Sequence, residues 1–268
     1  MIRATIGIFS QVGVTFDADA QAFFDRVDTA GGTLSDTEKE AVNQLVLDMK
    51  DDGIWSSMKV IYPMVGASAA ACAQNLKSSS FTGTFNGGWT FASTGATPNG
   101  TNGYMNTGLN VDSVLDGTNS HLSYYSRTSF TNNNDNYMLG AYSTSPSVRF
   151  YAMDYSTSSN FLASLGNLSP FNIAAISDTN GFFMVTKKTN NEQKIFRNNI
   201  TLDTETQSFT DKPNLNIYIG CLNINGNPSS YNTVEVALSS IGDGLTDTEA
   251  SDFYDAVQAF NTTLSREV

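Results

Sequence analysis

The clearest folding signal lies in residues 181–220, which read GFFMVTKKTNNEQKIFRNNITLDTETQSFTDKPNLNIYIG. Short runs of β-branched and aromatic residues occur at positions 182–186, 194–197 and 216–220. Clusters of Asn, Thr and Asp separate these runs, and Asn198 and Asn199 tolerate the left-handed backbone of a tight turn. Short strands joined by such turns are typical of a β-sandwich.

The same pattern extends toward the N-terminus from this stretch. Further short runs, separated by Asn, Gly and Ser, occupy positions 88–91, 121–125, 137–142 and 148–152. Their regular spacing predicts one large sandwich over residues 78–240. The chain of 268 residues is long enough to bury an extensive core as a single unit.

Both flanks of the predicted sandwich are helical. Within residues 17–77, Asp17 can cap a first helix, and Ser35 with Glu38 forms a capping box for a second helix that Gly53 ends. Residues 54–58 then predict another helical turn, which ends before Pro63. Residues 1–16 alternate weakly and suit a strand or an extended arm that anchors the protein.

A marked amphipathic helix is predicted in the last segment, residues 241–268. Thr246 and Glu249 form a second capping box, and Phe253, Val257 and Phe260 lie on one apolar stripe. A helix of this kind gains most of its stability by packing its apolar face. We therefore expect it to dock on the sandwich or on a partner subunit.

The charge balance excludes several classes of partner. Fourteen basic and 26 acidic residues give a net charge of −12, and only 15% of residues are charged. Binding to nucleic acid or to an anionic membrane requires a cationic face, so neither is expected. There is no signal-peptide pattern at the start and no apolar stretch of membrane-spanning length. Cys72 and Cys221 are expected to be buried free thiols.

The residues needed for most catalytic or metal sites are absent from the sequence. His121 is the single histidine, it lies in a predicted strand, and no Gly-x-Ser-x-Gly motif accompanies it. One histidine and two isolated cysteines cannot supply the clustered ligands of a zinc site. We expect no catalytic residues, no metal and no cofactor.

One enzymatic alternative stays open, namely glycoside hydrolysis by a pair of carboxylates. Such a pair must lie about 5–9 Å apart across a cleft. Asp203 and Glu205 alternate along one segment, and Glu235 lies in a separate predicted strand. A structure can test this alternative, because separations well beyond about 10 Å remove the mechanism.

Aromatic side chains interspersed with Asn, Ser and Thr provide candidate contacts for sugars. Sugar rings stack on aromatic faces, and amides or hydroxyls bind their hydroxyl groups. We take Trp89, Tyr104 and Tyr124 as candidate glycan contacts. The alternative for each of these residues is that its ring fills the core between the sheets.

Two resemblances add to this interpretation. Residues 194–202, followed by 212–220, resemble laminin-G and concanavalin-like sandwiches, with Asn198 and Asn199 at the tight turn. Residues 17–24, 34–66, 85–90 and 241–250 resemble a recurring module of tailed-bacteriophage virion proteins. We therefore expect a mainly β protein, a concanavalin- or laminin-G-like jelly roll with a helical N-terminal prefix and a C-terminal helix.

The bacteriophage resemblance implies a non-enzymatic virion structural protein, a decoration or fibre component attached to the head or tail. Its expected partners are other virion proteins, further copies of itself and a host-surface glycan, and it would be assembled in the bacterial cytoplasm. Two alternatives remain at this point. One is a glycan depolymerase on the same fold, and the other is a purely structural cement protein whose aromatic residues all lie in the core.

Overall fold

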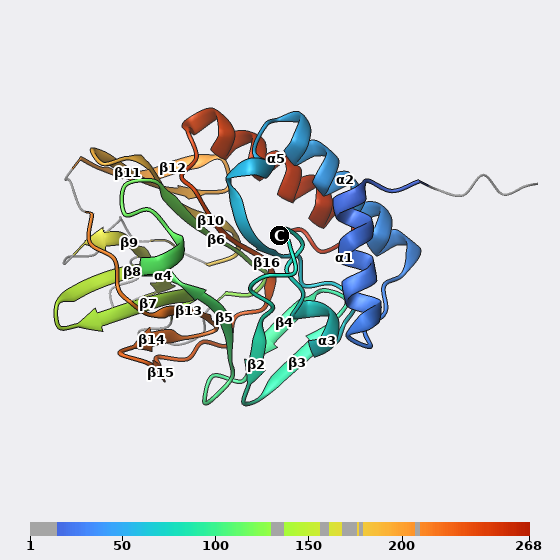
Figure 1. Ribbon diagram of the computed structural model, residues 1–268, viewed down its shortest axis with the longest axis horizontal. Helices are drawn as coiled ribbons and strands as arrows, with labels where there is room; N and C mark the ends of the chain where they lie inside the picture. The colour runs from blue at the N-terminus through green and yellow to red at the C-terminus, as the bar shows by residue number, and fades with distance from the viewer. Residues whose placement is uncertain (1–14, 130–136, 156–160, 168–175, 177–178, 207–209) are drawn as a thin grey trace, which may run out of the picture.

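The computed structural model describes residues 15–129, 137–155, 161–167, 176, 179–206 and 210–268. Three layers make up this part of the chain: a layer of helices, an eight-stranded sheet A beneath it, and an eight-stranded sheet B (Figure 1). The predicted β-sandwich with flanking helices is therefore confirmed. Positions 1–14 of the predicted N-terminal arm lie outside the described residues.

Sheet A is the middle layer and runs in the order β12-β11-β10-β6-β16-β4-β3, with β1 also paired to β16. Its pairings are all antiparallel. The strands are β1 Met58–Tyr62, β3 Trp89–Ala92, β4 Gly95–Pro98, β6 Ser120–Ser126, β10 Gly181–Thr189, β11 Glu192–Arg197, β12 Ile200–Glu205 and β16 Val236–Gly242.

Sheet B runs in the order β15-β14-β7-β13-β5-β2, and β8 continues from β7 to β9. Only the β14–β7 pairing is parallel among those described. The strands are β2 Thr84–Asn86, β5 Tyr104–Asn110, β7 Leu139–Thr144, β8 Ser147–Tyr155, β9 Phe161–Asn167, β13 Asn216–Ile219, β14 Leu222–Ile224 and β15 Asn227–Ser229.

The helical layer consists of α1 (Ala18–Thr29), α2 (Asp36–Asp51) and α5 (Asp247–Thr263). Both predicted capping boxes are present, Ser35 with Glu38 and Thr246 with Glu249. Three short turns connect other elements: η1 (Trp55–Ser57), α3 (Ala69–Cys72) and α4 (Val111–Val114).

The segment after Gly53 differs from its prediction. Only Trp55–Ser57 is helical, as a single 3-10 turn, and Met58–Tyr62 forms strand β1 instead of continuing the helix. Val60, Ile61 and Tyr62 are all fully buried, because β1 pairs with β16 between the helices and the inter-sheet core. A continuous apolar run of this kind has no periodicity that distinguishes a strand from a helix.

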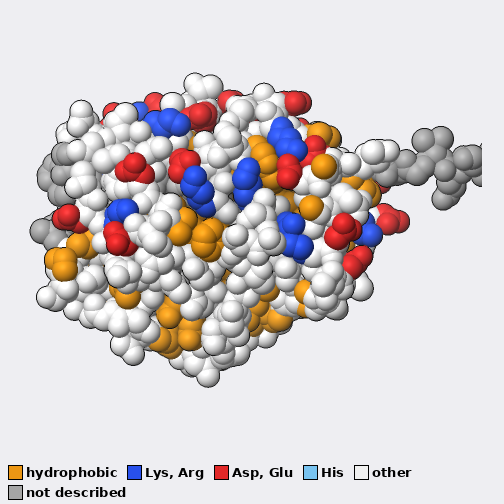
Figure 2. Space-filling view, viewed as in Figure 1, with side chains coloured by type: hydrophobic (Ala, Val, Ile, Leu, Met, Phe, Trp, Pro, Cys, Tyr) orange, Lys and Arg blue, Asp and Glu red, His pale blue; other side chains and the backbone are white. Residues whose placement is uncertain are grey.

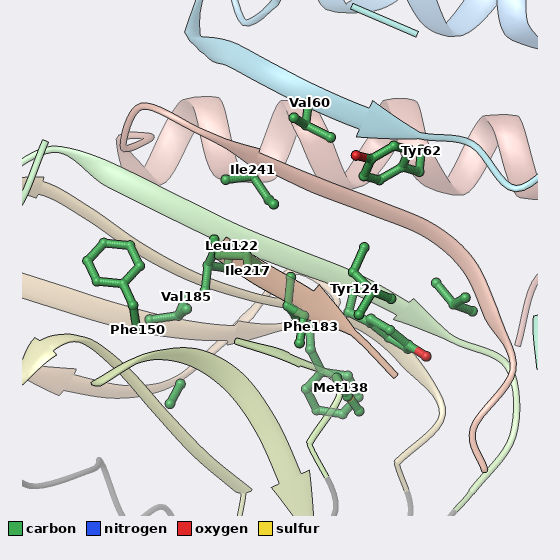
Figure 3. Packing of buried hydrophobic residues seen from close by; sticks show 14 of the residues in the cluster. Val60, Tyr62, Leu122, Tyr124, Met138, Phe150, Phe183, Val185, Ile217 and Ile241 are labelled. Atoms are coloured by element: carbon green, nitrogen blue, oxygen red, sulfur yellow. The ribbon is translucent and has the colours of Figure 1, made fainter. Parts of the chain in front are cut away.

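Two hydrophobic cores lie on either side of sheet A. The first fills the space between the sheets, where Tyr124 and Phe183 from sheet A meet Phe150 and Ile217 from sheet B (Figure 3). The second packs α1, α2 and α5 on the outer face of sheet A, with Phe253 of α5 against Phe182 of β10. The central strands β6, β10 and β16 of sheet A are therefore buried on both faces over most of their length.

Candidate functional site

The outer face of sheet B is the face of the sandwich that none of the described helices α1, α2 and α5 covers (Figure 1). Strand alternation determines which side chains lie on it. In β13, Ile217 and Ile219 belong to the inter-sheet core, so Tyr218 lies on the opposite face. In β5, Met105 and Leu109 belong to the core, so Tyr104 and Asn106 lie on the outer face.

Five of the 11 tyrosines gather on and beside this face, and we call them the tyrosine platform. Its members are Tyr104, Tyr137, Tyr142, Tyr218 and Tyr231. Tyr218 is buried, and the other four are half-buried. The rings of Tyr104 and Tyr218 have centroids 4.8 Å apart and planes inclined by 32°.

Tyr231 lies near this pair, and Tyr137 and Tyr142 pack together in a separate cluster around Leu222. Burial, and then the neighbouring Tyr104, raises the pKa of the Tyr218 hydroxyl. The pKa of Tyr231 is also raised, first by burial and then by nearby Cys221 and Tyr104. Tyr137 and Tyr142 pack around buried Leu222 with two further aliphatic side chains, Leu162 and Ile224. The platform is therefore a set of supported aromatic rings.

Asparagines lie beside the platform on the same two strands and the turn before β13. The Nδ2 amide of Asn216 donates to Oδ1 of Asn106 at 3.2 Å, and that of Asn110 donates to Oδ1 of Asn214 at 2.9 Å. Each amide offers two donors and two acceptor lone pairs. Oδ1 of Asn106 also accepts from the Gly108 amide, and Oδ1 of Asn110 accepts from the amides of Asp112 and Ser113, so the capacity left for ligand hydroxyls lies mainly in the second N–H of each donating Nδ2 group. Rings beside fixed amides are the combination that sugar binding requires.

Most strands that build this part of the molecule contain no charged residue, and β8 with Arg149 is the exception among the strands beside the platform. Residues 78–111, 137–148 and 213–234 include β2, β3, β4, β5, β7, β13, β14 and β15, and no Asp, Glu, Lys or Arg occurs in them. In Figure 2 the lowest part of the molecule shows hydrophobic side chains and no blue or red ones, whereas charged side chains occupy the middle and upper parts. The platform tyrosines therefore lie in uncharged segments, and Arg149 of the neighbouring strand β8 stacks on one of them, Tyr142.

The structure separates the three predicted glycan contacts. Tyr104 lies on the tyrosine platform. Trp89 lies at the edge of the inter-sheet core, half-buried beside Phe85 with ring centroids 4.9 Å apart, and its Nε1 donates to the Asn86 carbonyl at 3.2 Å. Tyr124 must be removed from the set, because its side chain is 0% exposed and its hydroxyl donates to the Val234 carbonyl inside the core.

The candidate carboxylates do not form a catalytic pair across the sheet. Glu235 is buried at the start of β16 and accepts hydrogen bonds from Arg127 Nη1, at 2.8 Å, and from the Thr94 hydroxyl. Asp203 and Glu205 lie on β12, four strand positions from β16 in sheet A. At the usual interstrand spacing this is a separation of roughly 19 Å, which is too large for glycoside hydrolysis.

His121 forms a buried polar relay that resembles a catalytic dyad in its contacts. Nδ1 is 2.6 Å from the Asp243 backbone oxygen and therefore carries the proton, so Nε2 accepts from the Ser240 hydroxyl at 2.9 Å. Burial lowers the pKa of His121 to about 4. The ring is fully buried between sheet A and Phe253 of α5, so no substrate reaches it in this structure.

The cysteine prediction is confirmed, since Cys72 and Cys221 are free and buried, and burial raises the pKa of each to about 12. In the described parts of the chain, no three side chains of His, Cys, Asp or Glu are grouped so as to hold a metal ion. No described helix has the length and apolar character needed to cross a bilayer.

Comparisons with known proteins show similarity at the level of the fold. No protein-family model and no curated protein matches the sequence. Among solved structures, the chain resembles domain 4 of a GH43 extracellular arabinanase from Geobacillus stearothermophilus, in complex with arabinotriose. The TM-score is 0.50 at 15% identity, over 74% of this chain and 98% of that domain.

Two further similarities have lower scores. The botulinum neurotoxin serotype D binding domain matches with a TM-score of 0.48 at 12% identity, over 76% of this chain and 52% of that chain. The CBM40 of Ruminococcus gnavus IT-sialidase, bound to α2,3-sialyllactose, matches with a TM-score of 0.40 at 15% identity, over 48% of this chain and 79% of that one. The match to the arabinanase domain shows that the fold is a β-sandwich also found in that domain.

Proposed function

We propose that this chain is a non-enzymatic glycan-binding protein whose recognition surface is the tyrosine platform. The observation that carries the proposal is an uncharged face of supported tyrosines and asparagines that α1, α2 and α5 leave uncovered. Aromatic faces stack on the apolar side of a sugar ring, and amides exchange hydrogen bonds with its hydroxyls. Tyr104, half-exposed over Tyr218, is the central contact.

The fold similarity supports this proposal by analogy only. The arabinanase domain of similar fold is in complex with arabinotriose. A sandwich of this shape can therefore present a sugar-binding surface, although fold does not by itself imply function. The position of the site in this chain rests on its own residues.

We further propose that the protein is carried on a tailed-bacteriophage particle, as a decoration or fibre component of the head or tail. The support is the sequence resemblance over residues 17–24, 34–66, 85–90 and 241–250. Repeated attachment to a symmetric particle favours a homo-oligomer. Mass spectrometry of purified particles should detect the chain beside other virion proteins, and its absence from them would refute this placement.

The positions of the candidate carboxylates Asp203, Glu205 and Glu235 bear on whether the protein binds or cleaves a glycan. Because Glu235 is engaged by Arg127 and lies far from β12, it cannot act as the catalytic partner of Asp203 or Glu205, which leaves only these two neighbours on β12 as a candidate pair. Incubation with a bound glycan should leave its chain length unchanged by chromatography. Release of shorter products would favour the enzymatic alternative.

The direct test is a glycan array probed with the purified protein and two variants. Tyr104→Ala removes a platform ring, whereas the matched control Tyr254→Ala removes a half-buried ring on α5. We expect binding that is lost in Tyr104→Ala and retained in Tyr254→Ala. No binding by the wild-type protein would refute the proposal and favour the cement alternative, and equal loss in both variants would refute the assignment to the platform.

A further inference from the structure

We infer that the tyrosine platform selects uncharged glycans and discriminates against sugars that carry carboxylate, sulfate or phosphate. The inference rests on the proposed glycan-binding function and specifies its ligand class. It follows from the distribution of charged residues around the platform. The aromatic and amide side chains alone do not determine whether the ligand is neutral or charged.

The segments that carry the platform tyrosines contain no charged residue. All platform tyrosines lie in the charge-free segments 78–111, 137–148 and 213–234. An anion that moves from water onto such a surface loses hydration, and this cost is offset only by a charge-assisted hydrogen bond or an ion pair. Tyrosine hydroxyls and asparagine amides offer neutral partners, which match the hydroxyl groups of a neutral sugar instead.

The charged residues elsewhere in the protein also bear on which ligands approach the platform. Several lysines on the helical side are engaged by carboxylates: Lys50 by Asp17 at 2.7 Å, Lys59 by Asp243 at 2.9 Å, and Lys194 by Asp247 at 2.8 Å. The net charge of −12 gives an anion no long-range attraction to the protein. An acidic glycan would gain no attraction on approach.

One described cation lies next to the platform and must be considered. The guanidinium carbon of Arg149, on β8, stands 4.8 Å from the centroid of the Tyr142 ring. This position stacks the guanidinium on an aromatic face, and the Tyr142 hydroxyl lies 3.3 Å from that of Ser147. We assign Arg149 to the support of Tyr142, and the experiment below tests this assignment against direct recognition of an anion.

The experiment compares ligands that differ in charge but share their backbone. We would measure binding of oligogalacturonate against its fully methyl-esterified form, and of α2,3-sialyllactose against its carboxyl methyl ester, together with the best neutral array ligand and its C6-carboxylate derivative. Titration calorimetry at 50 and 500 mM NaCl reports affinity and its salt dependence. We expect at least one neutral member to bind about tenfold or more tightly than its charged counterpart, with less than about a twofold salt effect.

The outcomes separate the two proposals. Preferential binding of the carboxylated members would overturn the neutral-ligand inference while leaving glycan binding intact. Absence of binding to every glycan on the array, neutral and charged, would refute the proposed function itself. Equal affinity for both members of a pair would also overturn the inference, because it would show that the uncharged surface does not discriminate.

Variants test the physical cause. Arg149→Gln should change neutral-glycan affinity less than about threefold and leave the preference intact, whereas a change confined to charged ligands would assign Arg149 to anion recognition. Thr84 is exposed on β2 opposite Asn106, so Thr84→Lys adds a cation to the edge of the face, and Thr84→Gln is its uncharged control. We expect only Thr84→Lys to raise affinity for the carboxylated ligands, and only at low salt.

Discussion

The two outer faces of this sandwich are used in opposite ways. The outer face of sheet A lies under α1, α2 and α5, where Phe182, Met184 and Phe253 are buried and the helices carry dense charges. The outer face of sheet B keeps half-buried tyrosines and no charge in most of its strands. Burial of apolar area is the main stabilising contribution to folding, so the helical side is where this second core adds stability.

This difference shows how one fold can separate stability from recognition. A ligand face has to keep apolar rings accessible, which forgoes part of the free energy that their burial would supply. Here the helical layer provides an additional core, so the opposite face is free to stay open. Substitutions on the two faces should therefore affect different measurements.

The largest effect is expected from Phe253→Ala in the helical layer. The ring is fully buried and contacts Phe182 at a centroid distance of 5.4 Å. Its loss should lower the free energy of unfolding by about 3–5 kcal/mol, measured by urea denaturation. The folded fraction should still bind glycan like the wild type. A loss below about 1 kcal/mol would contradict the role assigned to this layer.

Acidification should weaken the same layer through His121. Burial holds its folded-state pKa at about 4, below the usual value near 6.5, so its contribution is complete above pH 6.5 and is lost as the pH falls toward 4. The full loss is on the order of 3 kcal/mol. Denaturation curves of the wild type and of His121→Gln, compared at pH 7 and pH 4.5, isolate this contribution. The variant should show a smaller decline, and parallel declines would contradict the prediction.

On the open face, Tyr104→Ala should affect binding more than stability. Loss of the ring should weaken glycan affinity about tenfold, or roughly 1.4 kcal/mol, measured by calorimetry. Because the ring is half-exposed, the free energy of unfolding should fall by less than in Phe253→Ala. The contrast between the faces would fail if Tyr104→Ala were the more destabilising of the two.

The smallest effect is expected at the start of α5. The Thr246 hydroxyl accepts a hydrogen bond from the Glu249 amide within the capping box. Thr246→Ala should cost about 1 kcal/mol of unfolding free energy with glycan binding unchanged. Thr248→Ala, in the first turn of the same helix, controls for the general loss of a threonine hydroxyl. An equal cost in both variants would argue against a specific capping contribution.

Much of the fold could be predicted from local sequence signals. The capping residues Asp17, Ser35 and Thr246 marked the starts of the three long helices, and Asn198 adopts the left-handed backbone expected of the turn between β11 and β12. These signals act over a few residues. Strand β1 was missed because its pairing partner, β16, is remote in sequence and its apolar run has no helical or strand periodicity.

The candidate site was only partly predictable for a related reason. Tyr104 was identified, but Tyr137, Tyr142, Tyr218 and Tyr231 become neighbours only through the order β14-β7-β13-β5 in sheet B. Tyr124 was placed in the site although its strand, β6, is paired on both edges and buried on both faces. Composition indicates that aromatic residues are available, and sheet topology determines which of them face solvent.

The pairing of β1 with β16, and the packing of α2 against α5, also have a consequence for the order of folding. Helices α1 and α2 leave the ribosome well before β16 and α5, the partners of their apolar faces. At about 5–20 residues per second, this interval lasts on the order of 10–40 s. During it the apolar faces of α1 and α2 lack these partners, so they are available for aggregation or for capture by chaperones.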